Sequence, residues 1–191
     1  LSWDDWHYNR LEALQNIEPG AEWDLPNAGK PLQRDLGYIL WMIQIQPAEV
    51  EAVIRRLKLP ASLMASVVSA CLLWQERAAL KGSPPSLAVR KLENGSLLAC
   101  YALYLATDDP ELREVLLQYV QHWRKVEPSI NGHDLRAAGI PPGPVYRVLL
   151  GKLRDARLDG KITTAAEEKA YLEELIDLYM SLNEGQESEA R

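Results

Sequence analysis

The chain has 191 residues, of which 47% are hydrophobic and 25% are charged, a composition that is typical of a globular protein and excludes a disordered one. This length allows one large domain or two small ones. The net charge of −6 excludes a chain that is basic over its whole surface, as a general nucleic-acid-binding protein would be.

The first 128 residues have the pattern of a series of helices. Their apolar residues recur with a period near 3.6, and no stretch alternates apolar and polar residues as a half-buried strand does. The pattern predicts helices over residues 4–17, 32–45, 47–59, 61–81, 83–94, 96–106 and 110–126. Because short loops join them, we predict an all-α fold, an antiparallel multi-helix bundle or array, with a body domain over residues 1–128.

The composition changes at Pro128, which is the predicted boundary to a smaller helical tail domain over residues 129–184. Asp134 is placed to cap a short helix over residues 135–138. Gly139 is placed to end this helix in the left-handed conformation, which glycine adopts without steric strain. The residues that follow, Ile-Pro-Pro-Gly-Pro, predict a sharp turn because proline cannot continue a helix.

Two longer helices complete the predicted tail domain. The first covers residues 144–158 and stops at Asp159-Gly160. The second is capped by one of two threonines at 163–164, and Glu167 follows the second threonine at the spacing of a capping box. Beyond this helix, residues 185–191 are predicted to form a frayed polar tail.

Charge is unevenly distributed along the chain. Residues 124–161 hold eight Lys/Arg and four Asp/Glu, a net charge of +4, whereas residues 1–123 carry −4 and residues 162–191 carry −6. One basic segment therefore separates two acidic ones. Either this reflects ordinary variation between solvated surfaces, or the basic segment binds a polyanion.

The Gly/Pro turn and the helix after it have the features of a phosphate-binding surface. Backbone N–H groups beside Gly143 have no partner within the helix, and the helix dipole favours an anion there. At 100° per residue, one side of the helix carries three arginines within about 80°: Arg147, Arg154 and Arg157. Lys161 follows the helix end and His133 lies next to the turn, so we predict that these six residues contact nucleic acid.

The same residues have a plainer interpretation. The turn is then a stiff connector, and the arginines belong to an ordinary solvated helix face. Leu150 falls inside the arginine strip and Lys152 falls outside it, which favours this second interpretation.

Four motifs of residues 131–168 have the order and spacing of a known family. They are Gly-x-Asp-Leu at 132–135, Gly-Ile-x-Pro-Gly-Pro at 139–144, Leu-Asp-Gly at 158–160 and Thr-x-x-Glu at 164–167. On these motifs the stretch resembles the C-terminal module of the class II tRNA nucleotidyltransferase and bacterial poly(A) polymerase family. Residues 1–128 agree with that family only in being helical and of suitable length.

The resemblance implies that this chain is the RNA-binding body and tail region of such an enzyme. In that family a separate N-terminal domain, with a Gly-Gly phosphate loop and paired metal-binding carboxylates, adds nucleotides to RNA 3′ ends. We expect this domain upstream of Leu1, because neither feature occurs in the sequence. The implied partners are tRNA, or another RNA 3′ end region, and the catalytic domain. Mg²⁺ and nucleoside triphosphates are implied for that domain alone, so we expect this chain to be inactive by itself and to hold no cofactor.

No catalytic or metal-binding motif is recognisable in the chain itself. The three histidines are far apart, and no His/Cys cluster, nucleotide-binding loop or nucleophile motif occurs. Cys71 and Cys100 stand alone in apolar stretches, as buried free thiols of a reducing compartment do. Because no apolar run is long enough for a bilayer and none resembles a signal peptide, we expect a cytoplasmic location without a membrane partner.

The tryptophans before residue 128 provide a separate prediction. Trp41 and Trp74 lie in apolar stretches and are predicted core residues. Trp3, Trp6 and Trp23 lie in more polar sequence and are predicted to face the catalytic domain rather than to stack on bases.

Two other functions remain open. One is a non-catalytic helical module that forms a homodimer, or packs against a neighbouring domain, through its apolar N-terminal helices. The other is a helix-hairpin-helix DNA-binding module, since that element shares the Gly-Ile-x-Pro-Gly turn and prefers duplex DNA to tRNA.

Overall fold

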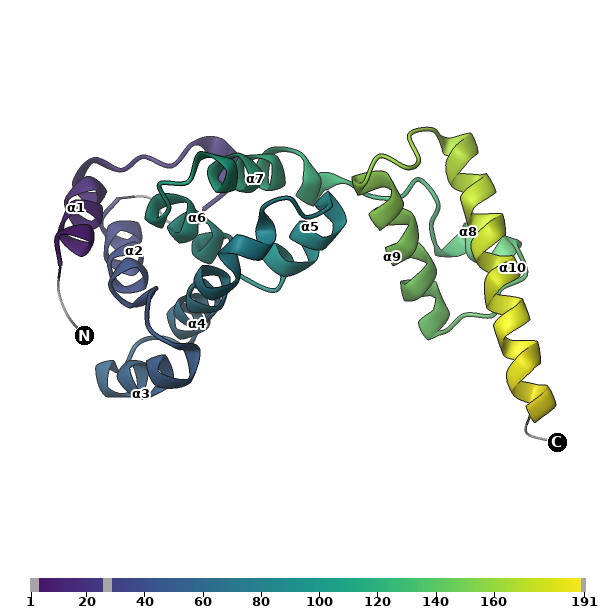
Figure 1. Cartoon of the computed structure of the whole chain (residues 1–191), viewed down its shortest axis with the longest axis horizontal. Coiled ribbons are helices and arrows are strands. Elements are labelled where there is room, and N and C mark those ends of the chain that lie inside the picture. The colour runs from purple at the N-terminus through teal and green to yellow at the C-terminus, as the bar shows by residue number, and fades with distance from the viewer. Residues whose placement is uncertain (1–3, 26–28, 190–191) are drawn as a thin grey trace. The chain divides into compact units, whose positions relative to one another are not determined.

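Helices joined by loops make up the part of the chain that the structure describes. The computed structural model describes residues 4–25 and 29–189, with side chains described up to residue 180. Within these ranges all regular structure is helical, so the predicted all-α fold is confirmed (Figure 1). No described helix is long and apolar enough to span a membrane.

The chain divides into two compact units, each described here by itself. The first comprises residues 1–83 and 87–124, and the second comprises residues 84–86 and 125–191. The predicted boundary at Pro128 therefore lies just inside the second unit.

The helices before residue 126 follow the predicted order, and all of them lie in the first unit except for residues 85, 86 and 125. They are α1 (Asp5–Ala13), α2 (Lys30–Met42), α3 (Pro47–Leu57), α4 (Ala61–Glu76), α5 (Pro85–Glu93), α6 (Leu97–Ala106) and α7 (Pro110–Gln121). Short 3₁₀ turns are η1 (Leu14–Asn16), η2 (Ala21–Trp23), η3 (Arg77–Leu80) and η4 (Trp123–Lys125).

Polar side chains cap several of these helices. The Asp4 carboxylate accepts a hydrogen bond from the His7 N–H at 3.1 Å at the start of α1. The Asp109 carboxylate accepts from the N–H groups of Glu111 and Leu112 at the start of α7. Such caps satisfy N–H groups that have no partner within the helix.

The core of the first unit lies where α4 packs against α2, α3 and α6 (Figure 1). An apolar stripe of α2 and of the residue that follows it is fully buried: Leu36, Ile39, Leu40 and Ile43. Cys71 and Cys100 are buried free thiols, as predicted, and burial raises the pKa of each to about 12. Neither thiol is therefore a nucleophile at neutral pH.

The tryptophans depart from their predictions. Trp23, predicted to lie on a surface, is 2% exposed and packs against the rings of Tyr101 and Tyr104. Trp41 and Trp74, predicted to be core residues, are only half-buried. Trp6 is also half-buried and contacts Trp74 edge to face, whereas Trp3 lies outside the described residues.

The second unit contains α8 (Gly132–Ala137), α9 (Pro144–Leu158) and α10 (Ala165–Glu189). Both predicted glycine stops are confirmed, with φ of +84° at Gly139 after α8 and +70° at Gly160 after α9. In each case the glycine N–H and the next N–H bond back to carbonyls of the last helical turn, which is the Schellman arrangement.

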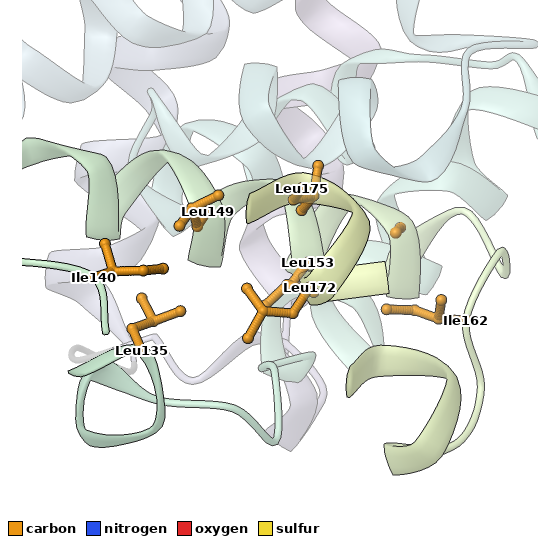
Figure 2. Packing of buried hydrophobic residues seen from close by; sticks show 8 residues of the cluster. Leu135, Ile140, Leu149, Leu153, Ile162, Leu172 and Leu175 are labelled. Atoms are coloured by element: carbon orange, nitrogen blue, oxygen red, sulfur yellow. The ribbon is translucent and has the colours of Figure 1, made fainter. Parts of the chain in front are cut away.

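Leucines and isoleucines from all three helices form the core of the second unit. Leu153 of α9 and Leu172 of α10 lie at its centre, Leu135 and Ile140 lie at one end, and Ile162 lies at the other (Figure 2). Leu135 and Leu153 are fully buried. Because this cluster draws on α8, α9, α10 and both connecting turns, it fixes the Gly/Pro turn relative to the helices.

Two details of the second unit differ from the prediction. Asn131, not Asp134, caps α8, and Asp134 instead accepts a hydrogen bond from the Asn131 N–H at 2.8 Å. The reciprocal bonds of this capping box start the helix at Gly132, earlier than predicted. The last helix, α10, continues as far as Glu189, and residues 190 and 191 of the predicted tail lie outside the described residues.

Candidate nucleic-acid interface

The Gly/Pro turn leaves the start of α9 open. Gly143 precedes α9 in an extended conformation, with a φ of 172°, and no side chain caps the helix there. The Tyr146 hydroxyl donates a hydrogen bond to the Ile140 carbonyl at 2.9 Å, which closes the turn on its inner side. Pro144 has no N–H, and the Tyr146 N–H donates to the Gly143 carbonyl at 3.1 Å, so the Val145 N–H is the group at the start of α9 that is open to an external acceptor.

Three of the predicted site residues have exposed side chains: Arg147 of α9, Lys161 after α9 and His133 of α8. Arg147 lies one turn into α9. A Cβ added at Gly132 would lie 3.5 Å from the Tyr146 ring, so the start of α8, next to His133, packs against the start of α9. The backbone next to His133 therefore lies close to Tyr146, the residue before Arg147.

Arg154 and Arg157 are held by the protein itself. Arg154 Nε donates to the Val126 carbonyl at 2.9 Å, and Arg157 Nη1 donates to the Glu127 carbonyl at 3.0 Å. Arg157 Nε also lies 3.4 Å from Glu168 Oε2. Because a guanidinium carries five N–H donors, Arg157 has further N–H groups that can face a phosphate.

The arginine strip is therefore divided in two. Arg147 and Arg157 are ten residues apart, which corresponds to about 15 Å along a helix. Arg147 lies by the turn, whereas Arg154 and Arg157 lie near the far end of α9, where Lys161 follows. Leu150 packs partly against the core of the second unit and is not a solvated member of the strip.

An apolar groove, which no sequence pattern predicts, runs beside the turn. It has a volume of about 620 Å³ and is lined by Pro141–Val145, Val148, Leu149, Lys152, Leu175, Leu178 and Tyr179. Val148 and Leu178 are 54% and 50% exposed. Lys152, which the helical projection places away from the arginine strip, is the one charged residue of this lining.

Acidic residues of the second unit act mainly on neighbouring polar groups. The Asp159 carboxylate accepts from both the N–H and the hydroxyl of Ser86 at 3.0 Å. Glu167 accepts from Thr163 and Thr164 at the start of α10, and these bonds lower its pKa to about 2. Among the described residues, no three His, Cys, Asp or Glu side chains come together as a metal site requires.

Glu168 is a buried charged residue that the sequence pattern does not single out. Its carboxylate is fully buried on α10 and accepts bonds from the N–H and hydroxyl of Ser129 and from the N–H of Ile130. Burial alone raises the pKa of Glu168, but these bonds and the Arg157 charge outweigh it, so the pKa is lowered. In the sequence it reads as one of several glutamates of an acidic helix, because its partners lie almost 40 residues away.

Comparison with known proteins gives one partial relationship. No protein-family model matches the chain, and no solved structure is matched either. An A-adding tRNA nucleotidyltransferase of Geobacter sulfurreducens is 37% identical over 71 residues, which are 37% of this chain and 8% of that protein. The match thus spans less than a tenth of the relative's own length. Over part of its length, the chain is similar to an A-adding tRNA nucleotidyltransferase.

Proposed function

We propose that the chain is an RNA-binding helical portion of a tRNA nucleotidyltransferase, in which the second unit contacts tRNA. The open start of α9 at Gly143, with exposed Arg147 one turn further on, is the observation that carries the proposal. Backbone N–H groups at a helix start and a nearby arginine are both suited to phosphate oxygens. The similarity to an A-adding tRNA nucleotidyltransferase supports tRNA as the polyanion.

The proposed contacts differ in kind between the two ends of α9. At the turn, Gly143, Arg147 and His133 contact one stretch of the RNA backbone. At the other end, Lys161, Arg154 and Arg157 contact a second stretch. The catalytic step, with its Mg²⁺ and nucleoside triphosphate, belongs in this proposal to a separate domain, and the chain alone transfers no nucleotide.

The test measures tRNA affinity of the whole chain over a series of salt concentrations, for example by fluorescence anisotropy. Log affinity should fall linearly with log salt, because each phosphate contact releases a counterion. Arg147→Ala should reduce the magnitude of the slope by about one. Arg56→Ala is the matched control, because Arg56 is an exposed arginine on α3 of the first unit.

Gly143→Ala gives a second variant that leaves the fold intact, since no heavy atom lies within 4 Å of an added Cβ and the backbone is extended. A methyl group beside the open Val145 N–H should weaken tRNA binding without lowering thermal stability. Salt-independent binding, or equal affinity of wild type, Arg147→Ala and Gly143→Ala, would show that the turn is not the contact surface.

The two open alternatives predict other outcomes in the same assays. A helix-hairpin-helix module would prefer duplex DNA to tRNA at equal salt. A homodimer or interdomain module would sediment as a dimer or bind a partner with no response to tRNA. Sedimentation of the chain with and without tRNA distinguishes these from the proposed function.

A further inference from the structure

Residues 126–130 have no regular secondary structure of their own, yet their backbone groups are bonded to side chains of α9 and α10. Two carbonyls, those of Val126 and Glu127, accept from Arg154 and Arg157 at 2.9 and 3.0 Å. Two N–H groups, those of Ser129 and Ile130, donate to Glu168 at 3.2 and 3.1 Å. Pro128, between them, has no N–H to donate.

Three charged side chains thus bond to four backbone groups of this segment, and two of these side chains also pair with each other. Arg157 Nε lies 3.4 Å from Glu168 Oε2. The arginine side chain is 24% exposed and the glutamate 0% exposed, so the pair is screened from solvent far more than a surface ion pair. Charged partners make stronger hydrogen bonds to backbone groups than neutral ones do.

We propose that Arg154, Arg157 and Glu168 form a clamp that fixes residues 126–130 and thereby sets where α8 begins. Asn131, the residue after the clamped segment, is the cap of α8. Ile130 packs against the core of the second unit, and Leu135 of α8 belongs to that core. The clamp therefore connects α9 and α10 to the helix that leads into the Gly/Pro turn. In this proposal the two arginines position residues 126–130, and this role does not depend on RNA.

The test is amide hydrogen exchange of the whole chain without RNA. Glu168→Gln keeps the side-chain volume but removes the charge that Ser129, Ile130 and Arg157 share. Exchange at the Ser129 and Ile130 amides should become about tenfold faster or more, and Arg157→Gln should act on the same two amides. Glu174→Gln on the exposed face of α10 and Arg147→Gln on the exposed face of α9 are the matched controls, for which no change is expected.

Limited trypsin digestion provides an independent measure. Cleavage after Lys125, beside the clamped segment, should rise in Glu168→Gln relative to cleavage after Arg136, which is exposed within α8. Unchanged exchange at Ser129 and Ile130 overturns the proposal. So does an equal rise at both trypsin sites and at amides throughout α8 and α9, because Glu168 would then support the whole unit and not this segment.

Discussion

At the scale of single residues, Glu168 has the most unusual environment. A buried carboxylate is normally driven towards its neutral form. Here hydrogen bonds from Ser129 and Ile130, and the charge of Arg157, stabilise the ionised form and lower the pKa. A carboxyl whose pKa is lower in the folded state adds stability above its unfolded pKa, and loses that contribution as pH falls through its folded pKa.

Glu168→Gln should therefore destabilise the protein in a pH-dependent way. At pH 7 we expect a loss of about 1.5–3 kcal/mol, the usual contribution of hydrogen bonds to a charged group. Below pH of about 4.3, the pKa of an unperturbed glutamate, the difference between wild type and variant should shrink. Urea unfolding at pH 7 and at lower pH values, followed by circular dichroism, measures this difference. A difference that is constant with pH, or that grows on acidification, contradicts the assignment.

The arginines illustrate what sequence can predict at this scale. A helical projection predicts that Arg147, Arg154 and Arg157 share one side of α9, because that depends on local geometry alone. It does not predict that Arg154 and Arg157 bond to carbonyls 28 and 30 residues earlier, because the path of residues 126–130 depends on tertiary packing. The burial of Trp23 could not be predicted for the same reason, since its partners Tyr101 and Tyr104 lie far along the chain.

At the scale of elements, two glycines of one turn have opposite roles. Gly139 ends α8 with a φ of +84°, a conformation that strains any residue with a Cβ. Gly143 begins α9 in extended backbone with open space around it, so its lack of a Cβ serves no steric need of the fold. A glycine in that position instead leaves the helix start accessible.

Alanine substitutions should separate these roles. Gly139→Ala should destabilise the protein by about 1 kcal/mol, because alanine resists the left-handed conformation. Gly143→Ala should leave the free energy of unfolding unchanged or slightly raised, since the unfolded chain loses some freedom. Thermal unfolding of both variants beside wild type measures this. A larger loss of stability in Gly143→Ala than in Gly139→Ala would contradict the claim that the lack of a Cβ at Gly143 serves no steric need of the fold.

Most elements could be predicted because their signals are local. Asp4, Asp109, Thr164 and the two glycine stops mark helix ends within a few residues of sequence. The start of α8 at Gly132 could not be predicted, because both Asn131 and Asp134 are good capping residues. The folded backbone shows that these two residues cap the helix jointly. The apolar groove could not be predicted, since α9 and α10 approach each other through packing of residues well separated in sequence.

At the scale of the whole molecule, the two units have separate cores. Leu36 is fully buried in the first and Leu153 in the second. The six tryptophans all precede residue 124, so intrinsic tryptophan fluorescence reports on the first unit alone. Circular dichroism at 222 nm reports on the helices of both units. Comparison of the fluorescence and circular dichroism transitions therefore shows whether the two units unfold together.

We predict that the two units unfold as separate cooperative transitions, because each buries its own apolar cluster. Leu153→Ala should remove about 2–5 kcal/mol from the second unit alone. Its urea midpoint should fall for part of the circular dichroism signal, while the tryptophan fluorescence midpoint stays at the wild-type value. Leu36→Ala is the matched substitution in the first unit, and it should shift the fluorescence midpoint. If Leu153→Ala shifts the fluorescence midpoint as much as the circular dichroism midpoint, the prediction is wrong. A substitution in the second unit would then destabilise the first unit, which means that the two cores unfold as one cooperative structure.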